Sequence, residues 1–168
     1  MFGFGQLIGI LKKNPKKIVF TEGEDPRILE ASSRLLASYF LHPILIGDEK
    51  RIADAAEESG FNIRGAEIID PEKFDKIDEM VELYCELRKK KGVTPDQARE
   101  ILKQANYFGT MLVKMGFADA LLGGATYSTA DTVRPALQLI KTKPGNNLVS
   151  SCFILVRPSA TGDNEVLA

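Results

Sequence analysis

Cysteine and histidine are scarce in this sequence, which limits the chemistry that it can support. Two cysteines and one histidine occur among 168 residues, and none of them lies at a spacing typical of metal ligands. Cys85 and Cys152 are isolated, which favours free thiols in a reducing cytoplasm. His42 stands beside Pro43 in apolar surroundings and is interpreted as structural. No metal site is predicted.

Several familiar catalytic patterns are also missing. The sequence contains no Ser/His/Asp set, no Cys/His pair, no dinucleotide-binding GxGxxG motif and no Walker phosphate-binding loop. A formal net charge of −1 gives no indication that nucleic acid or a membrane surface is a partner. The function therefore has to be sought outside these classes.

Long hydrophobic runs are absent too. The opening stretch MFGFGQLIGILKK is apolar, but no basic residue precedes its apolar part and no small-residue cleavage site follows it. A signal peptide is therefore not expected, and no stretch is long enough to span a bilayer. A short amphipathic helix is predicted here, and a cytoplasmic protein is expected.

What the sequence does contain is an alternation of short apolar runs and longer helical patterns. Apolar residues make up 44% and charged residues 27% of the chain, which is typical of a globular protein. The alternation predicts an α/β fold with an open, largely parallel sheet and helices on both faces. Strands are predicted at residues 17–21, 43–48, 66–70, 118–123 and 148–156, and helices at about 26–40, 49–59, 74–90, 95–104, 106–116 and 129–140. Thr94 and Gln97 have the pattern of a capping box with proline at the first helical position, and Asn106 is expected to cap the helix after it.

The end of the chain suggests a domain boundary. Residues 1–147 are predicted to form one α/β domain, and residues 148–168 to begin a second one. SATGDNEV (residues 159–166) is typical of a turn that leads into a new strand, and the sequence stops two residues later. A domain rarely ends as a strand begins, so we expect the chain to be part of a longer protein.

The loop at residues 123–129 is the first candidate binding site. In parallel α/β sheets, ligands collect beyond the carboxyl ends of strands, where helix N-termini present free N–H groups. Gly123 and Gly124 would let the backbone approach a ligand closely, while Ser128 and Thr129 offer hydroxyl groups.

An arginine and a proline stand side by side in the helix that follows. Proline is tolerated in the first turn of a helix, so the helix is expected to begin at residues 129–131 with Arg134 in about its first turn. A positive charge there opposes the helix dipole, which suggests an anionic ligand. The alternative is a glycine-rich turn in which Arg134 pairs with a local carboxylate such as that of Asp131.

Two further charged motifs are less specific. ELRKKKG (residues 86–92) places four cations at the end of a predicted helix, where they suit its negative end. Arg88 is singled out within it because a guanidinium can bind phosphate through two hydrogen bonds. TEGED (residues 21–25) follows the first strand, and its acids would repel an anion. Asp25 is expected to cap the helix that Pro26 begins.

The combined motifs resemble the N-terminal half of the phosphate acetyltransferase (phosphotransacetylase) family. The resemblance runs from about residue 16 to the end, through FTEGEDPRILEA, YCELRKKKGVT, NYFGTMLVKMGFADALLGGATYSTADTVRPALQLIKTKPG and VSSCFILVRP. It implies a two-domain fold of the isocitrate dehydrogenase-like type, usually a homodimer, with a cleft between the domains.

The resemblance also implies an activity and two binding residues. Members of the family interconvert acetyl-CoA and phosphate with acetyl phosphate and CoA, and coenzyme A is a substrate, so no cofactor is implied. Family arginines that bind CoA or acyl phosphate match Arg88 and Arg134. The family's serine-arginine-aspartate group, whose aspartate is thought to deprotonate the CoA thiol, has no match here. No catalytic residue is therefore assigned to this chain, and the chain alone is expected to be inactive.

This sequence departs from the family pattern at two positions, and further functions remain open. Many relatives have histidine at the position of Tyr127 and proline at that of Thr21. A phosphate butyryltransferase would use the same frame with a roomier acyl pocket. A non-catalytic module that senses acetyl-CoA would also fit the sequence, and so would a non-functional portion of an enzyme.

Overall fold

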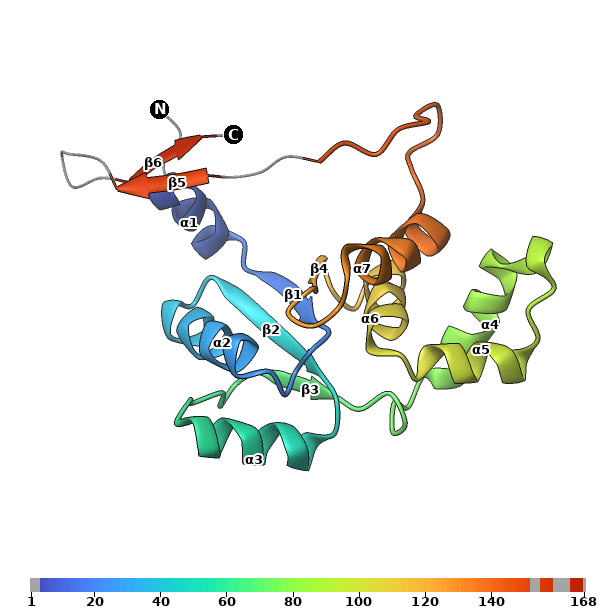
Figure 1. Cartoon of the computed structure of the whole chain (residues 1–168), viewed down its shortest axis with the longest axis horizontal. Helices are drawn as coiled ribbons and strands as arrows, with labels where there is room; N and C mark the ends of the chain where they lie inside the picture. The colour runs from blue at the N-terminus through green and yellow to red at the C-terminus, as the bar shows by residue number, and fades with distance from the viewer. Residues whose placement is uncertain (1–3, 152–154, 159–163, 168) are drawn as a thin grey trace.

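The computed structural model describes residues 4–151, 155–158 and 164–167. At its centre lies a four-stranded parallel sheet with the strand order β3-β2-β1-β4 (Figure 1). The register places Phe20 in β1 beside Leu45 in β2 and Leu122 in β4. Three strands thus end at the same edge of the sheet. The strands are β1 (Lys16–Phe20), β2 (Leu41–Ile46), β3 (Glu67–Ile69) and β4 (Ala120–Leu122).

Helices cover both faces of this sheet, as the strand–helix alternation predicts (Figure 1). Successive side chains of a strand point to opposite faces, and the two buried clusters follow this rule. Phe20 packs with Ile28 and Ile52, from the helices of one face. Val19 packs in the larger cluster of the other face, with Phe108. The first face carries α2 (Pro26–Ser38) and α3 (Glu49–Ser59), and the second carries α4 (Ile77–Leu87), α5 (Pro95–Leu102) and α6 (Ala105–Lys114).

The remaining elements lie around this core. α1 (Phe4–Lys13) precedes β1 and forms the amphipathic helix predicted there. α7 (Thr129–Pro135) follows β4 and continues into a π-helical turn, η2 (Ala136–Ile140). None of the helices in the described ranges is long and apolar enough to cross a bilayer.

Local capping signals determine several helix starts, and these predictions are confirmed. Asp25 caps α2 by accepting a hydrogen bond from the N–H of Arg27, with Pro26 as the first helical residue. Thr94 and Gln97 form both hydrogen bonds of a capping box at the start of α5. α3 has the bounds that its sequence predicts.

Two helix predictions need correction. The helix predicted at residues 74–90 begins at Ile77, and Phe74 precedes it with its ring packed edge-on against Phe108 at a centroid distance of 5.3 Å. It ends at Leu87, and a separate 3₁₀ turn, η1 (Lys89–Lys91), follows. Asn106 does not cap α6: Gln104 holds the cap position, and Asn106 is buried inside the first turn.

The strand predicted at residues 148–156 is wrong over its first part. Residues 148–151 are irregular, with Leu148 and Val149 exposed by 84% and 63%, and residues 152–154, including Cys152, lie outside the described ranges. β5 (Leu155–Pro158) pairs in antiparallel fashion with β6 (Asn164–Leu167), in a sheet separate from the central one. The domain boundary after residue 147 stays a prediction.

Candidate anion-binding site

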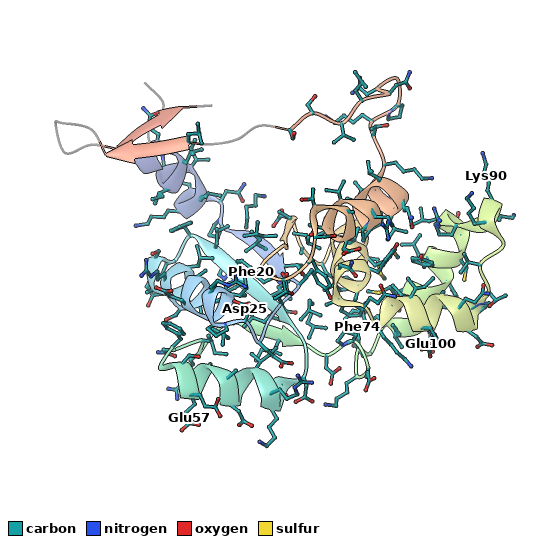
Figure 2. All side chains as sticks on the ribbon, viewed as in Figure 1. Phe20, Asp25, Glu57, Phe74, Lys90 and Glu100 are labelled. Carbon is teal, nitrogen blue, oxygen red and sulfur yellow. The ribbon has the colours of Figure 1, made fainter. Side chains whose placement is uncertain are left out.

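Two loops meet at the carboxyl ends of β1 and β4. The TEGED loop (residues 21–25) follows β1, and the segment from Gly123 to Ser128, here called the glycine loop, follows β4. β1 and β4 are hydrogen-bonded neighbours in the sheet, so the two loops are adjacent. Asp25, labelled in Figure 2, marks this edge of the sheet. Ligands of parallel α/β folds bind at such an edge.

The Glu22 carboxylate accepts hydrogen bonds from backbone N–H groups of the glycine loop. Its Oε1 accepts hydrogen bonds from the N–H groups of Thr126 (2.7 Å) and Tyr127 (3.1 Å), and from the Thr126 hydroxyl (3.3 Å). The N–H of Gly124 lies 3.2 Å from both carboxylate oxygens. The N–H groups of the loop that was expected to approach a ligand therefore donate to a negative side chain of the protein itself.

The surroundings keep Glu22 ionised. Burial opposes the charge and would raise the pKa of Glu22, but the backbone hydrogen bonds from Thr126 and Tyr127, and the hydroxyl of Thr21, outweigh it, so the pKa lies below its usual range. Thr21 is buried and donates to Oε2 at 2.9 Å. A proline at this position would lack that hydroxyl.

Two glycines allow the loop to close around the carboxylate. A Cβ atom on Gly123 would lie 2.7 Å from the Thr21 hydroxyl oxygen, so only glycine fits there without a shift. Gly124 has a φ of +111°, a conformation that L side chains rarely adopt. The pair of glycines therefore serves the contact with the TEGED loop.

Arg27 also forms a hydrogen bond to the glycine loop. Its guanidinium donates to the Ala125 carbonyl at 2.7 Å and to the Asp25 carboxylate at 2.6 Å. The side-chain hydrogen bond to Asp25 raises the pKa of Arg27, which stays charged. Sequence reasoning missed both Glu22 and Arg27; for Glu22 the acid-rich TEGED motif was the available signal.

Tyr127 lies in the same loop, and its side chain is partly buried. Burial raises the pKa of its phenol, and the negative charges of Glu22 and Asp131 raise it further. The side chain is therefore neutral at physiological pH.

The glycine loop leads directly into α7. Ser128 caps this helix: its hydroxyl accepts from the Asp131 N–H at 3.2 Å and donates to the Asp131 carboxylate at 2.6 Å. Thr129 is the first helical residue and is exposed. The predicted helix start is confirmed, and the Ser128 hydroxyl is engaged in capping it.

Arg134 lies further along α7 than the sequence suggests. It is the sixth residue of the helix, in the second turn, so its placement in the first turn needs correction. Its guanidinium lies 3.9 Å from the Asp131 carboxylate, and the two side chains are exposed by 57% and 46%. The local pair considered from the sequence thus exists, but it is long and solvated.

Pro135 sits inside the helix, and Asn106 compensates for it. Proline has no N–H to donate to the carbonyl four residues back, which belongs to Asp131. The buried Asn106 side chain donates to that carbonyl at 2.8 Å. Beyond Pro135 the chain continues as η2, where the Lys141 N–H donates to the Ala136 carbonyl at 3.0 Å.

Arg88 lies in a different place, in what we call the basic groove. It is the C-terminal cap of α4, and its buried Nε has no hydrogen-bond partner. Among the described residues, none of the groove's five cations forms an ion pair. The groove has a volume of about 760 Å³ and is lined by Glu86, Leu87, Arg88, Lys89, Lys90, Lys91 and Lys141.

The structure groups some of the predicted site residues and separates others. Gly124, Ser128 and Thr129 share the glycine loop and the start of α7, while Arg88 meets Lys141 in the basic groove. Figure 2 shows Lys90 of the groove far from Asp25 at the sheet edge. The described ranges contain no cluster of three or more His, Cys, Asp or Glu residues able to hold a metal ion.

This geometry defines an α/β protein with a parallel sheet and two candidate anion sites: the glycine loop with the start of α7, and the basic groove. Comparison with known proteins gives the family. The model of the family described as "Phosphate acetyl/butaryl transferase" matches residues 4–168, and the chain belongs to that family.

Relatives and solved structures agree with this assignment. The chain is 50% identical to the phosphate acetyltransferase of Bacillus subtilis over 84% of its own length and 43% of that protein. It is 46% identical to the phosphate acetyltransferase of Thermoanaerobacterium thermosaccharolyticum, over 92% of its own length and 47% of that protein. The EutD phosphotransacetylase structure from Staphylococcus aureus superposes with a TM-score of 0.84 at 40% identity, covering 99% of this chain and 50% of that one. The chain thus spans about half the length of these relatives.

Proposed function

We propose that a polypeptide carrying this chain interconverts acetyl-CoA and phosphate with acetyl phosphate and CoA. The observation that carries the proposal is the basic groove, in which cations without ion pairs surround a buried Arg88 Nε that has no partner. An unmade hydrogen bond at a buried polar atom costs roughly 1–3 kcal/mol. A phosphate oxygen of a ligand would supply the missing acceptor.

The reaction places two anions together. A phosphate oxygen attacks the thioester carbonyl, the bond between the acyl carbon and sulfur breaks, and the CoA thiolate leaves and takes up a proton. Negative charge develops on the carbonyl oxygen during the attack. Arginines and N–H groups suit both the positioning of the anions and the stabilisation of that charge.

Each site residue has a role in this proposal. Arg88 and the groove lysines bind phosphate groups of CoA, and Arg134 binds the phosphate or acyl phosphate. Ser128 and Thr129 lie beside that ligand at the start of α7. The N–H of Gly124 already donates to Glu22, so Gly124 contributes by letting the backbone come close.

The other parts of the proposal concern the whole polypeptide. Residues 1–147 form the first domain and residues 148–168 begin the second, which carries the base that deprotonates the CoA thiol. The complete protein is a cytoplasmic homodimer that uses CoA as a substrate and needs no further cofactor.

The test is an assay of acetyl-CoA formation from acetyl phosphate and CoA. The complete polypeptide is expected to turn over, and the 168-residue chain alone is not. Robust turnover by the chain alone would show that its own residues supply the base. Faster reaction with butyryl phosphate would assign a butyryltransferase, an activity that the family description includes. Acetyl-CoA binding without turnover by the complete polypeptide would indicate a sensor module.

A further inference from the structure

Glu22 has no role in the binding proposal, yet its carboxylate makes an extensive set of contacts to the glycine loop. It receives three backbone N–H groups and two hydroxyls, from residues 102 to 105 positions away and from its neighbour Thr21. Hydrogen bonds to a charged acceptor are about twice as strong as neutral ones. This one carboxylate therefore contributes strongly to the loop conformation.

The contacts continue from the carboxylate to Arg134. Tyr127, whose N–H is bound by Glu22, is followed by Ser128, which caps α7. Ser128 holds Asp131, and Asp131 lies beside the Arg134 guanidinium. A displacement of the loop would therefore move the helix start and the side chains that face the ligand.

The carboxylate also directs where an anion can bind. Because the N–H groups of Gly124, Thr126 and Tyr127 are engaged, an incoming phosphate cannot use them without displacing Glu22. The phosphate can then bind only to side chains of α7, among which Arg134 supplies the positive charge. An anion bound there is held by groups that the loop positions and not by the loop amides.

We propose that Glu22 is a positioning residue for the acyl-transfer reaction: it fixes the glycine loop so that Ser128, Thr129 and Arg134 are held where the phosphate-bearing substrate binds. The inference rests on the proposed function. Glu22 touches no reacting atom in this arrangement and acts through the loop backbone.

The test compares four variants of the complete polypeptide. Glu22→Ala removes every acceptor, and Glu22→Gln keeps one oxygen for the loop amides. Thr21→Val removes a single donor with little change of shape. Glu24→Gln is the matched control, because Glu24 lies in the same loop but faces Arg51, at 2.7 Å.

Two readouts are taken well below the melting temperature of each variant. For Glu22→Ala we expect hydrogen exchange in residues 124–128 to accelerate at least tenfold and kcat/KM for acetyl phosphate to fall at least tenfold. Glu22→Gln should recover part of both losses. Thr21→Val should change kcat/KM by less than about threefold, and Glu24→Gln by less than twofold.

The contrary results are specific. Faster exchange with unchanged kcat and KM would make Glu22 structural and overturn the inference. Tighter binding of inorganic phosphate by Glu22→Ala would show that the carboxylate blocks an anion site, which also overturns it. A wild-type protein without turnover refutes the proposed function. The positioning of a phosphate site by Glu22 then still holds if Glu22→Ala weakens inorganic phosphate binding at least tenfold, and otherwise it fails as well.

Discussion

The glycine loop and the basic groove are both suited to anions, but their polar groups are in opposite states. In the glycine loop, the N–H groups of Gly124, Thr126 and Tyr127 bind the Glu22 carboxylate. In the basic groove, the described residues provide no carboxylate partner for any cation, and the Arg88 Nε is buried without a hydrogen bond.

Because of this difference, substitutions in the two regions should affect different quantities: the stability of the fold in one and ligand binding in the other. Where the protein satisfies its own groups, a substitution removes interactions of the folded state. Where it leaves cations unpaired, a substitution removes little from the folded state and even relieves repulsion between like charges. Groove variants should therefore change ligand affinity, and loop variants should change the free energy of unfolding.

The largest expected effect is on CoA binding by Arg88→Ala. Loss of a charge-assisted contact to a phosphate group costs about 1.5–3 kcal/mol, or roughly ten- to a hundredfold in Kd. Titration calorimetry with CoA measures it. The free energy of unfolding should not fall by more than about 0.5 kcal/mol, because the Nε of Arg88 has no hydrogen bond in the protein to lose.

Lysine variants provide the control for Arg88. Arg88→Lys should recover only part of the affinity, since an ammonium group cannot bind a phosphate with the geometry of a guanidinium. Lys141 has a φ of 66°, so Lys141→Gly removes its charge without imposing backbone strain. An unchanged Kd for both Arg88→Ala and Lys141→Gly would remove the basic groove from the proposal.

A second prediction concerns the support beneath α7. Asn106→Ala should lower the free energy of unfolding by about 1–3 kcal/mol, because it leaves the Asp131 carbonyl without its donor. Urea unfolding measures the change. Pro135→Ala restores a backbone N–H that can reach the same carbonyl. The double variant should therefore lose less than the sum of the two single variants; strict additivity would contradict the compensation of Pro135 by Asn106.

The third prediction uses the pH dependence of the glycine loop. The pKa of Glu22 in the folded protein lies below its usual range, because the loop hydrogen bonds outweigh burial. A lowered folded pKa gives stability that is present above the unfolded pKa and lost as the pH falls through the folded one. Glu22→Gln should therefore be about 1 kcal/mol less stable than wild type at pH 7, with the gap closing towards pH 3 in urea unfolding. A gap that stays constant with pH would mean that the charge of Glu22 contributes nothing.

Much of the fold was predictable because its signals are local. The cap at Asp25, the capping box of Thr94 and Gln97, and the bounds of α3 depend on residues a few positions apart. The strand–helix alternation predicted the parallel sheet because each strand of such a sheet is buried on both faces and reads as a short apolar run.

The candidate site was less predictable because its contacts are not local. Glu22 meets the glycine loop across 102 residues of sequence, and Asn106 reaches Asp131 across 25. From the sequence, the acid of TEGED seemed to repel a ligand, and Asn106 resembled a helix cap. Only the packing of β1 beside β4, and of α6 beneath α7, shows which backbone groups these side chains satisfy.

The smallest expected effect, on the stability of Arg134→Ala, sharpens the comparison because Arg134 belongs to the loop region and yet behaves like a groove residue. Its only described ion pair is 3.9 Å long and solvated on both sides, and exposed pairs of this kind contribute about 0–1 kcal/mol. Arg134→Ala should therefore change the free energy of unfolding by less than about 0.5 kcal/mol, while the KM for acetyl phosphate rises roughly ten- to a hundredfold in the complete polypeptide.

Asp131→Ala is the matched control, because Asp131 also holds the Ser128 cap and its loss should cost about 1 kcal/mol. A clearly lowered melting temperature of Arg134→Ala with unchanged kinetics would place Arg134 among the structural residues of α7, and the local pairing with Asp131 would then be its whole function.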